Sequence, residues 1–192
     1  GAKGALVLLD FNNVPVGLKA RPGTEGGRAS LEYIHAAIDL ALSGRADAIA
    51  TAPVNKVALS MAGCEQPGHT EILAERTGTD DFVMMLATPS CGASGSGDSC
   101  SSCNPLRVAL ATTHIALRNI FALLTPERIA TTIRITDRGL RDLFGIEQPR
   151  IAVAGLNPHA GEGGRFGNEE TEIIAPGIER ANAEGIDCTG PI

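Results

Sequence analysis

Short apolar runs alternate with longer stretches of helical periodicity along the whole sequence of 192 residues. Three of these runs are nearly continuous instead of alternating with polar residues, which is typical of strands that are covered on both faces. The expected strands are residues 5–9, 47–52, 82–87, 106–112 and 150–155. This alternation predicts an α/β fold in which helices flank a mostly parallel sheet, as one region over residues 1–192.

Three longer stretches carry helix signals. Apolar residues recur at helical spacing in residues 30–44. Residues 125–145 begin with Thr125 as the N-cap and a proline in the first helical position. Residues 168–185 begin with an asparagine and acidic residues that suit the helix dipole, and Pro176 is expected to kink or interrupt that helix.

The composition excludes some classes of protein. The net charge is −6 and the pI is near 5.2, whereas a nucleic-acid-binding groove needs a basic face. No apolar run approaches the length of about 18 residues that a membrane span needs, and the first ten residues lack the pattern of a signal peptide. We therefore expect a cytoplasmic protein that binds neither nucleic acid nor a membrane.

Residues 89–105 differ from the rest of the chain because Ser, Gly and Cys dominate them. This composition cannot form a core, so we expect a flexible insertion between two strands. Cys91, Cys100 and Cys103 leave open a metal site, a redox pair, or incidental thiols in a disordered loop, which is the interpretation we favour. Two further cysteines are expected to be isolated thiols: Cys64 and Cys188.

Two histidines follow the carboxyl ends of expected strands. His114 ends ATTH after residues 106–112, and His159 lies in NPHAGEGG after residues 150–155. Ligands of open α/β sheets bind outside these strand ends, and imidazole is a common ligand of Zn²⁺, Mn²⁺, Fe²⁺ and Co²⁺. The two residues are thus candidate metal ligands; alternatively, each ends a strand and bonds a loop carbonyl.

Other polar residues also lie in loops. Lys56 ends TAPVNK, where its amine can pair with a phosphate or carboxylate or remain solvated. His69 lies in PGHTE, just before a helical stretch, whereas His35 lies inside a helical pattern and is expected to be structural. The GEGGRFGNEE segment leads into a helix but lacks the spacing of a known phosphate-binding loop.

Several blocks together resemble the 4-hydroxythreonine-4-phosphate dehydrogenases of vitamin B6 biosynthesis. They are TAPVNK, PGHTEILAERTG, VMMLA, LRVALATTHIALRNI and RIAVAGLNPHAGEGGRFGNEE. The resemblance implies an isocitrate/isopropylmalate dehydrogenase-like fold, a two-lobed α/β enzyme that works as a homodimer. Because family members continue beyond both ends, it also implies that this chain is a fragment from the centre of the enzyme, one lobe plus part of the second.

The resemblance also implies roles for individual residues. His114 and His159 match metal ligands, and the third metal histidine of the family comes from the partner subunit. His69 and Thr70 match residues that bind the phosphorylated substrate. Lys56 is a possible catalytic residue that adds positive charge. The implied cofactors are a divalent metal (Zn, Mg or Co) and NAD or NADP.

The implied reaction is the NAD(P)-dependent, metal-assisted oxidation of 4-phosphooxy-threonine to a β-keto acid that decarboxylates. One alternative is a dehydrogenase of a related phosphorylated four-carbon hydroxy acid. Another is that this fragment alone is a non-catalytic lobe that binds metal or an anion and dimerises.

Overall fold

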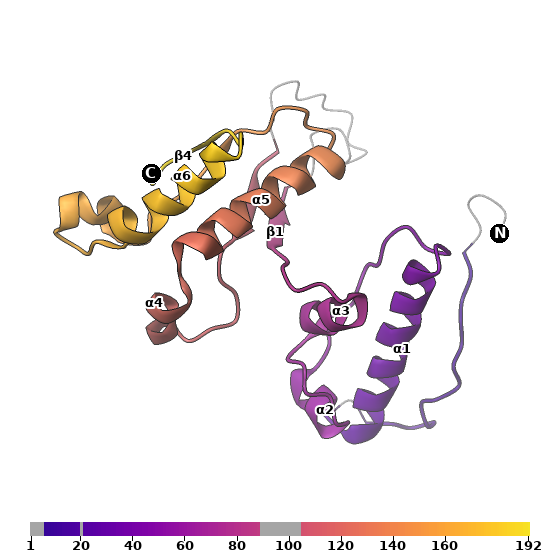
Figure 1. Cartoon of the computed structure of the whole chain (residues 1–192). Helices are drawn as coiled ribbons and strands as arrows, with labels where there is room; N and C mark the ends of the chain where they lie inside the picture. Colours follow the sequence, from indigo (N-terminus) through magenta and orange to yellow (C-terminus); the bar gives the residue numbers. More distant parts are fainter. Residues whose placement is uncertain (1–5, 20, 89–104) are drawn as a thin grey trace, which may run out of the picture. The chain divides into compact units, whose positions relative to one another are not determined.

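The protein forms two compact units in the computed structural model, which describes residues 6–19, 21–88 and 105–192 (Figure 1). The first unit is Gly1–Asp80 and the second is Asp81–Ile192. Each has a hydrophobic core of its own, whereas one continuous α/β region was expected from the sequence.

The described residues of the first unit form three helices connected by extended chain (Figure 1). They are α1 (Thr24–Leu42), α2 (Lys56–Met61) and α3 (His69–Thr77). Its core brings one face of α1 against the other two helices, through Ile34, Ile38, Leu59 and Ile72. Gly27 of α1 lies against the backbone of α2, where an added Cβ would collide with the carbonyl of Ala58. The helix expected over residues 30–44 is confirmed, and it begins six residues earlier.

Two expected strands of this unit do not form. Residues 6–9 and 47–52 have no ladder partner in the described part of the chain. Leu6, Val7 and Leu8 are all at least 70% exposed. The reason is that strand propensity mainly measures how well a side chain fits a paired, half-buried sheet, and it cannot supply the neighbouring strand.

In the part of the second unit that the structure describes, the chain forms four short strands and the remaining helices. In chain order its elements are β1 (Met84–Ala87), β2 (Arg107–Leu110), η1 (Leu117–Asn119), α4 (Ile120–Leu123), α5 (Pro126–Asp142), β3 (Ile151–Ala152), η2 (Pro158–Gly164), η3 (Glu170–Ile174), α6 (Ala175–Ala183) and β4 (Cys188–Thr189). Helices α5 and α6 pack against each other and form the core with Ile129, Ile133, Ile174 and Ile178. Three of the five expected strands therefore exist, in shorter form.

The strands form two separate pairs instead of one mostly parallel sheet. β1 and β2 are antiparallel, with Met84 opposite Leu110. β3 and β4 are parallel, with Ile151 opposite Cys188. The expectation that residues 47–52, 106–112 and 150–155 share one sheet is thus wrong for the described residues, because β2 and β3 each pair with a different neighbour.

The local helix signals match the structure closely. The side chain of Thr125 accepts a hydrogen bond from the backbone N–H of Arg128, and Pro126 opens α5. Near Pro176 the chain forms a π-helical turn, η3, before α6 begins. A proline supplies no backbone N–H and crowds the carbonyl four residues before it, so the expected interruption is observed.

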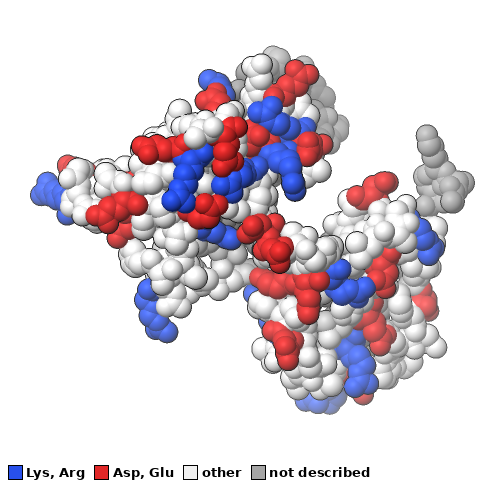
Figure 2. All heavy atoms as spheres, viewed as in Figure 1, with Lys and Arg blue, Asp and Glu red and all other residues white. Residues whose placement is uncertain are grey.

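On the face shown in Figure 2, acidic and basic side chains alternate over both units. Among the described residues, no helix is both long and apolar enough to cross a bilayer. Cys64 and Cys188 are free thiols, as expected. Burial raises the pKa of the Cys188 thiol, and the neighbouring Asp187 adds to the effect. The Ser/Gly/Cys-rich insertion lies outside the described residues except for Pro105.

Candidate functional site

The loop that carries His159 has an unusual backbone. Every residue from His159 to Gly164 has a positive φ, between 45° and 94°, so η2 turns with left-handed geometry. Three of these residues are not glycine: His159, Ala160 and Glu162. The left-handed conformation costs such residues about 1–2 kcal/mol each, so the surrounding contacts must hold the loop in place.

Glu170 provides those contacts. The residue is 3% exposed, and its carboxylate accepts hydrogen bonds from the backbone N–H groups of Leu156 (2.8 Å) and Asn157 (2.6 Å). It also accepts one from the side-chain amide of Asn157, at 3.0 Å. Burial raises the pKa of Glu170, but the hydrogen bonds from Asn157 and Leu156 outweigh this effect, so its pKa lies below the usual range.

His159 is exposed on this loop. Its ring lies beside Phe166, with 6.1 Å between the ring centroids. The backbone N–H of Phe166 donates to the carbonyl of Gly161, at 3.1 Å, which closes the loop. An exposed imidazole on a fixed backbone is suited to bind a ligand from solvent.

His114 has the same backbone character. It follows β2 in an exposed position and also has a positive φ, 54°. Three residues earlier, the carbonyl of Ala111 accepts a hydrogen bond from Nε of Arg128 in α5, at 2.9 Å. The end of β2 is thus tied to the α5–α6 core, against which Val153 beyond β3 also packs.

The two histidines fit a divalent cation in their chemistry, because imidazole is a preferred ligand of zinc and related metals. Within the residues that the structure describes, no group of three or more His, Cys, Asp or Glu side chains is gathered closely enough to hold a metal ion. Catalytic zinc sites commonly use three protein ligands. His114 and His159 can therefore account for only part of a ligand set.

The other predicted site residues lie in the first unit, around the start of α3. His69 is the first residue of this helix and Thr70 the second, and the N-cap is Gly68, which has no side chain to cap the helix. A Cβ built on Gly68 would lie 3.9 Å from Cε of Lys56. The stem of Lys56 therefore lies beside the amino end of α3, where backbone N–H groups can bind an anion.

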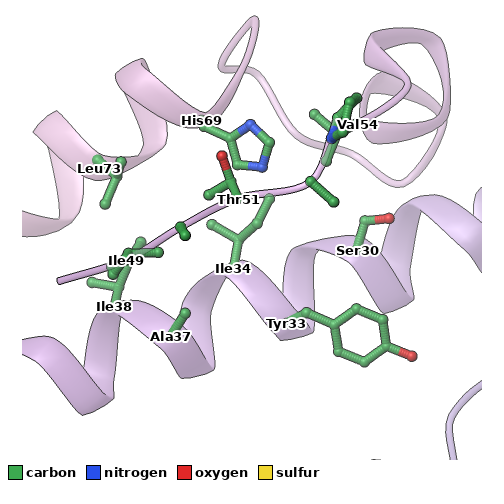
Figure 3. A pocket seen from close by; sticks show the side chains of 13 residues that line it. Ser30, Tyr33, Ile34, Ala37, Ile38, Ile49, Thr51, Val54, His69 and Leu73 are labelled. Carbon is green, nitrogen blue, oxygen red and sulfur yellow. The ribbon is translucent and has the colours of Figure 1, made fainter. Parts of the chain in front are cut away.

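His69 also borders a cavity of about 240 Å³ between α1 and the extended residues 49–54. Figure 3 shows its imidazole beside Thr51, with Ile34 of α1 below them. Most of the other lining residues are apolar: Ile38, Ile49, Val54 and Leu73 are examples. These walls suit an apolar group.

His35 has the structural surroundings expected of it. Nη1 of Arg76 lies 2.8 Å from its Nδ1, and the same guanidinium pairs with Asp39. These contacts connect α1 to α3. His35 is therefore a useful control residue for experiments on the other histidines.

Sequence reasoning missed Glu170 as a site residue. It grouped this glutamate with the acidic residues that favour the start of a helix. Glu170, Ile174 and Ile178 are four residues apart, so the glutamate lies on the apolar face of the helix. An acid in that position was the signal, because a buried carboxylate needs hydrogen-bond donors.

The sequence matches one known protein family over nearly its whole length. The family described as "Pyridoxal phosphate biosynthetic protein PdxA" matches residues 3–192, which include both histidine loops and the start of α3. The chain belongs to the PdxA family. A curated PdxA-family relative, the 4-hydroxythreonine-4-phosphate dehydrogenase of Burkholderia vietnamiensis (strain G4 / LMG 22486), is 49% identical over 180 residues. That alignment covers 92% of this chain and 51% of the relative, so the chain spans about half the length of the curated relatives it matches.

Solved structures agree with this membership and with an α/β fold. The 4-hydroxythreonine-4-phosphate dehydrogenase of Klebsiella pneumoniae is 44% identical with a TM-score of 0.75, over 89% of this chain and 47% of that one. A terephthalate 1,2-cis-dihydrodiol dehydrogenase from Burkholderia xenovorans LB400 is 28% identical with a TM-score of 0.59, over 95% of this chain and 54% of that one. The chain therefore has a structural neighbour that is named for a different substrate.

Proposed function

We propose that this chain is part of an NAD(P)-dependent, divalent-metal-assisted 4-hydroxythreonine-4-phosphate dehydrogenase of vitamin B6 biosynthesis. The observation that carries the proposal is the 49% identity to a relative of that name across 92% of the chain. The proposed architecture of the whole enzyme is the two-lobed isocitrate/isopropylmalate dehydrogenase-like fold, in the cytoplasm.

Each unit contains some of the residues that we propose to bind ligands. His69 and Thr70 donate hydrogen bonds to the substrate phosphate at the amino end of α3, and Lys56 adds a positive charge. His114 and His159 are the ligands that this chain would offer to a divalent cation, which would supply Lewis-acid polarisation of the substrate hydroxyl. NAD or NADP would supply the hydride acceptor.

The left-handed backbone at both histidines supports their assignment. Costly backbone conformations persist where the surrounding structure fixes them, and they are concentrated at functional sites. His114 and His159 share this property although they follow different strands.

The whole enzyme is also proposed to be a homodimer. Leu117, Phe121 and Leu123, in or next to α4, are each at least 50% exposed. Burial of such side chains against a second copy would stabilise an assembly. We propose that this short apolar helix contributes to the dimer surface.

A second candidate function differs in its substrate. The structural neighbour from Burkholderia xenovorans is named for a cis-dihydrodiol, which its name does not describe as phosphorylated. The alternative substrate is a related phosphorylated four-carbon hydroxy acid. The fold accommodates both because the substrate is chosen by loop residues and not by the core.

An absorbance assay separates the two candidates. The purified natural-length protein is incubated with NAD⁺ or NADP⁺ and Zn²⁺, Co²⁺ or Mg²⁺, and formation of reduced nicotinamide is followed. We expect turnover with 4-phosphooxy-threonine and at least a hundredfold lower kcat/KM with the unphosphorylated amino acid, because the anion contacts at α3 are lost. Turnover only with another hydroxy acid would move the function to the second candidate.

A further inference from the structure

We infer that Glu170 is a positioning residue, which fixes the His159 loop in the geometry that binds metal. The inference rests on the proposed function, because it gives that loop its purpose. Glu170 itself is buried at the start of η3, eleven residues after His159 in the chain. It acts on the histidine through the backbone on either side of it.

The contact before the histidine is made by hydrogen bonds. Two consecutive backbone N–H groups, of Leu156 and Asn157, point at the same carboxylate oxygen of Glu170. The side-chain amide of Asn157 bridges the second oxygen of Glu170 and the carboxylate of Glu169. The chain therefore enters the loop in one fixed direction, two residues before His159.

The contact after the histidine is made by close packing. Gly161 is buried, and a Cβ added there would lie 2.8 Å from Oε2 of Glu170 and 3.0 Å from the carbonyl of Gly167. A Cβ on Gly155, before the loop, would lie 3.0 Å from Cα of Ala160 and 3.4 Å from Oε1 of Glu170. The carboxylate thus fills the inside of the turn, and His159 has its neighbours on both sides fixed.

The physical argument is one of pre-organisation. If the loop already has its left-handed backbone before the metal binds, the free-energy cost of that conformation does not reduce the metal affinity. Groups that orient a metal ligand typically contribute ten- to hundredfold to metal affinity. A carboxylate is the right group here, because its two oxygens accept several N–H donors at once and its charge strengthens each bond.

The test compares Glu170→Gln with Glu172→Gln, an exposed acid two residues away. Both variants of the natural-length protein are titrated with Co²⁺, and the visible absorption of the bound ion is recorded. We expect Glu170→Gln to weaken Co²⁺ binding roughly ten- to hundredfold and to alter its spectrum. Glu172→Gln should match the wild type.

A second measurement is made without metal. Amide hydrogen exchange of residues 155–164 should accelerate at least tenfold in Glu170→Gln, with the helices α5 and α6 unchanged. If Glu170→Gln unfolds, Asn157→Ala replaces it. That variant removes the side-chain hydrogen bond from Asn157 to Glu170 and leaves the two backbone hydrogen bonds in place. Faster exchange with unchanged Co²⁺ affinity would overturn the positioning role, as would unchanged exchange. Wild-type protein that binds no Co²⁺ would instead overturn the proposed function.

Discussion

At the residue scale, the histidines of the candidate site were recognisable from the sequence and their backbone was not. His159 could be proposed as a ligand because it follows a strand in a glycine-rich loop. We infer that the left-handed φ of His159 depends on Glu170. This glutamate lies eleven residues after the histidine and nine after Gly161, the glycine that its carboxylate packs against. A local sequence pattern contains information about neighbours within a few residues. The only sequence signal of the contact between Glu170 and the His159 loop is therefore an acidic residue on the apolar face of a helix.

The glycines of the loop provide a matched pair for testing this account. Gly161→Ala and Gly163→Ala both place a methyl group at a positive φ, which costs about 1 kcal/mol. Only at Gly161 would the methyl group also meet the Glu170 carboxylate. We expect Gly161→Ala to lower the free energy of unfolding by about 1–3 kcal/mol more than Gly163→Ala, measured by urea denaturation. Equal losses would contradict the packing described here.

At the element scale, helices were predicted well and strands poorly. The Thr-Pro signal at the start of α5 and the interruption near Pro176 involve only local hydrogen bonds and sterics, which the sequence contains. The run at 47–52 has the composition of a strand, but a strand also needs a partner. Whether a partner strand is present depends on the fold of the whole chain. A local pattern therefore could not predict that residues 47–52 have no partner among the described residues.

The packing of α5 on α6 gives a prediction with a built-in control. A Cβ at Gly177 of α6 would lie 2.6 Å from Cβ of Ile129 and 2.8 Å from the carbonyl of Pro126, whereas one at Gly139 of α5 meets nothing within 4 Å. We expect Gly177→Ala to destabilise the protein by about 1–3 kcal/mol. Gly139→Ala should stabilise it by about 0.5–1 kcal/mol, since alanine is the better helix former. Thermal unfolding followed by circular dichroism decides the matter; a stabilising Gly177→Ala would refute the helix contact.

At the scale of the whole molecule, the described chain contains two cores and parts of two sites. The residues that we propose to bind the anion lie in the first unit, and the proposed metal ligands lie in the second. Family membership could be read from the sequence blocks, because they carry the site residues together with their loops. The division into two units could not, since apolar periodicity shows which faces are buried but not against which partner.

The proposed dimer is tested at this scale. Sedimentation velocity of the natural-length protein at micromolar concentration should show a dimer. Phe121→Ser should shift the equilibrium toward monomer, because it removes an exposed aromatic side chain from the proposed surface. Phe144→Ser, at an exposed aromatic residue beyond α5, is the control. A monomeric wild type, or equal effects of the two substitutions, would count against this dimer surface.

The central claim is that His114 and His159 bind the divalent cation of a dehydrogenase, and zinc content tests it most directly. The natural-length wild-type protein and its His35→Ala and His159→Ala variants are loaded with Zn²⁺, dialysed, and analysed for metal per chain, with circular dichroism to verify folding. We predict bound zinc in the wild type and in His35→Ala, and loss of most of it in His159→Ala. A folded His159→Ala variant with the zinc content of the wild type would contradict the claim.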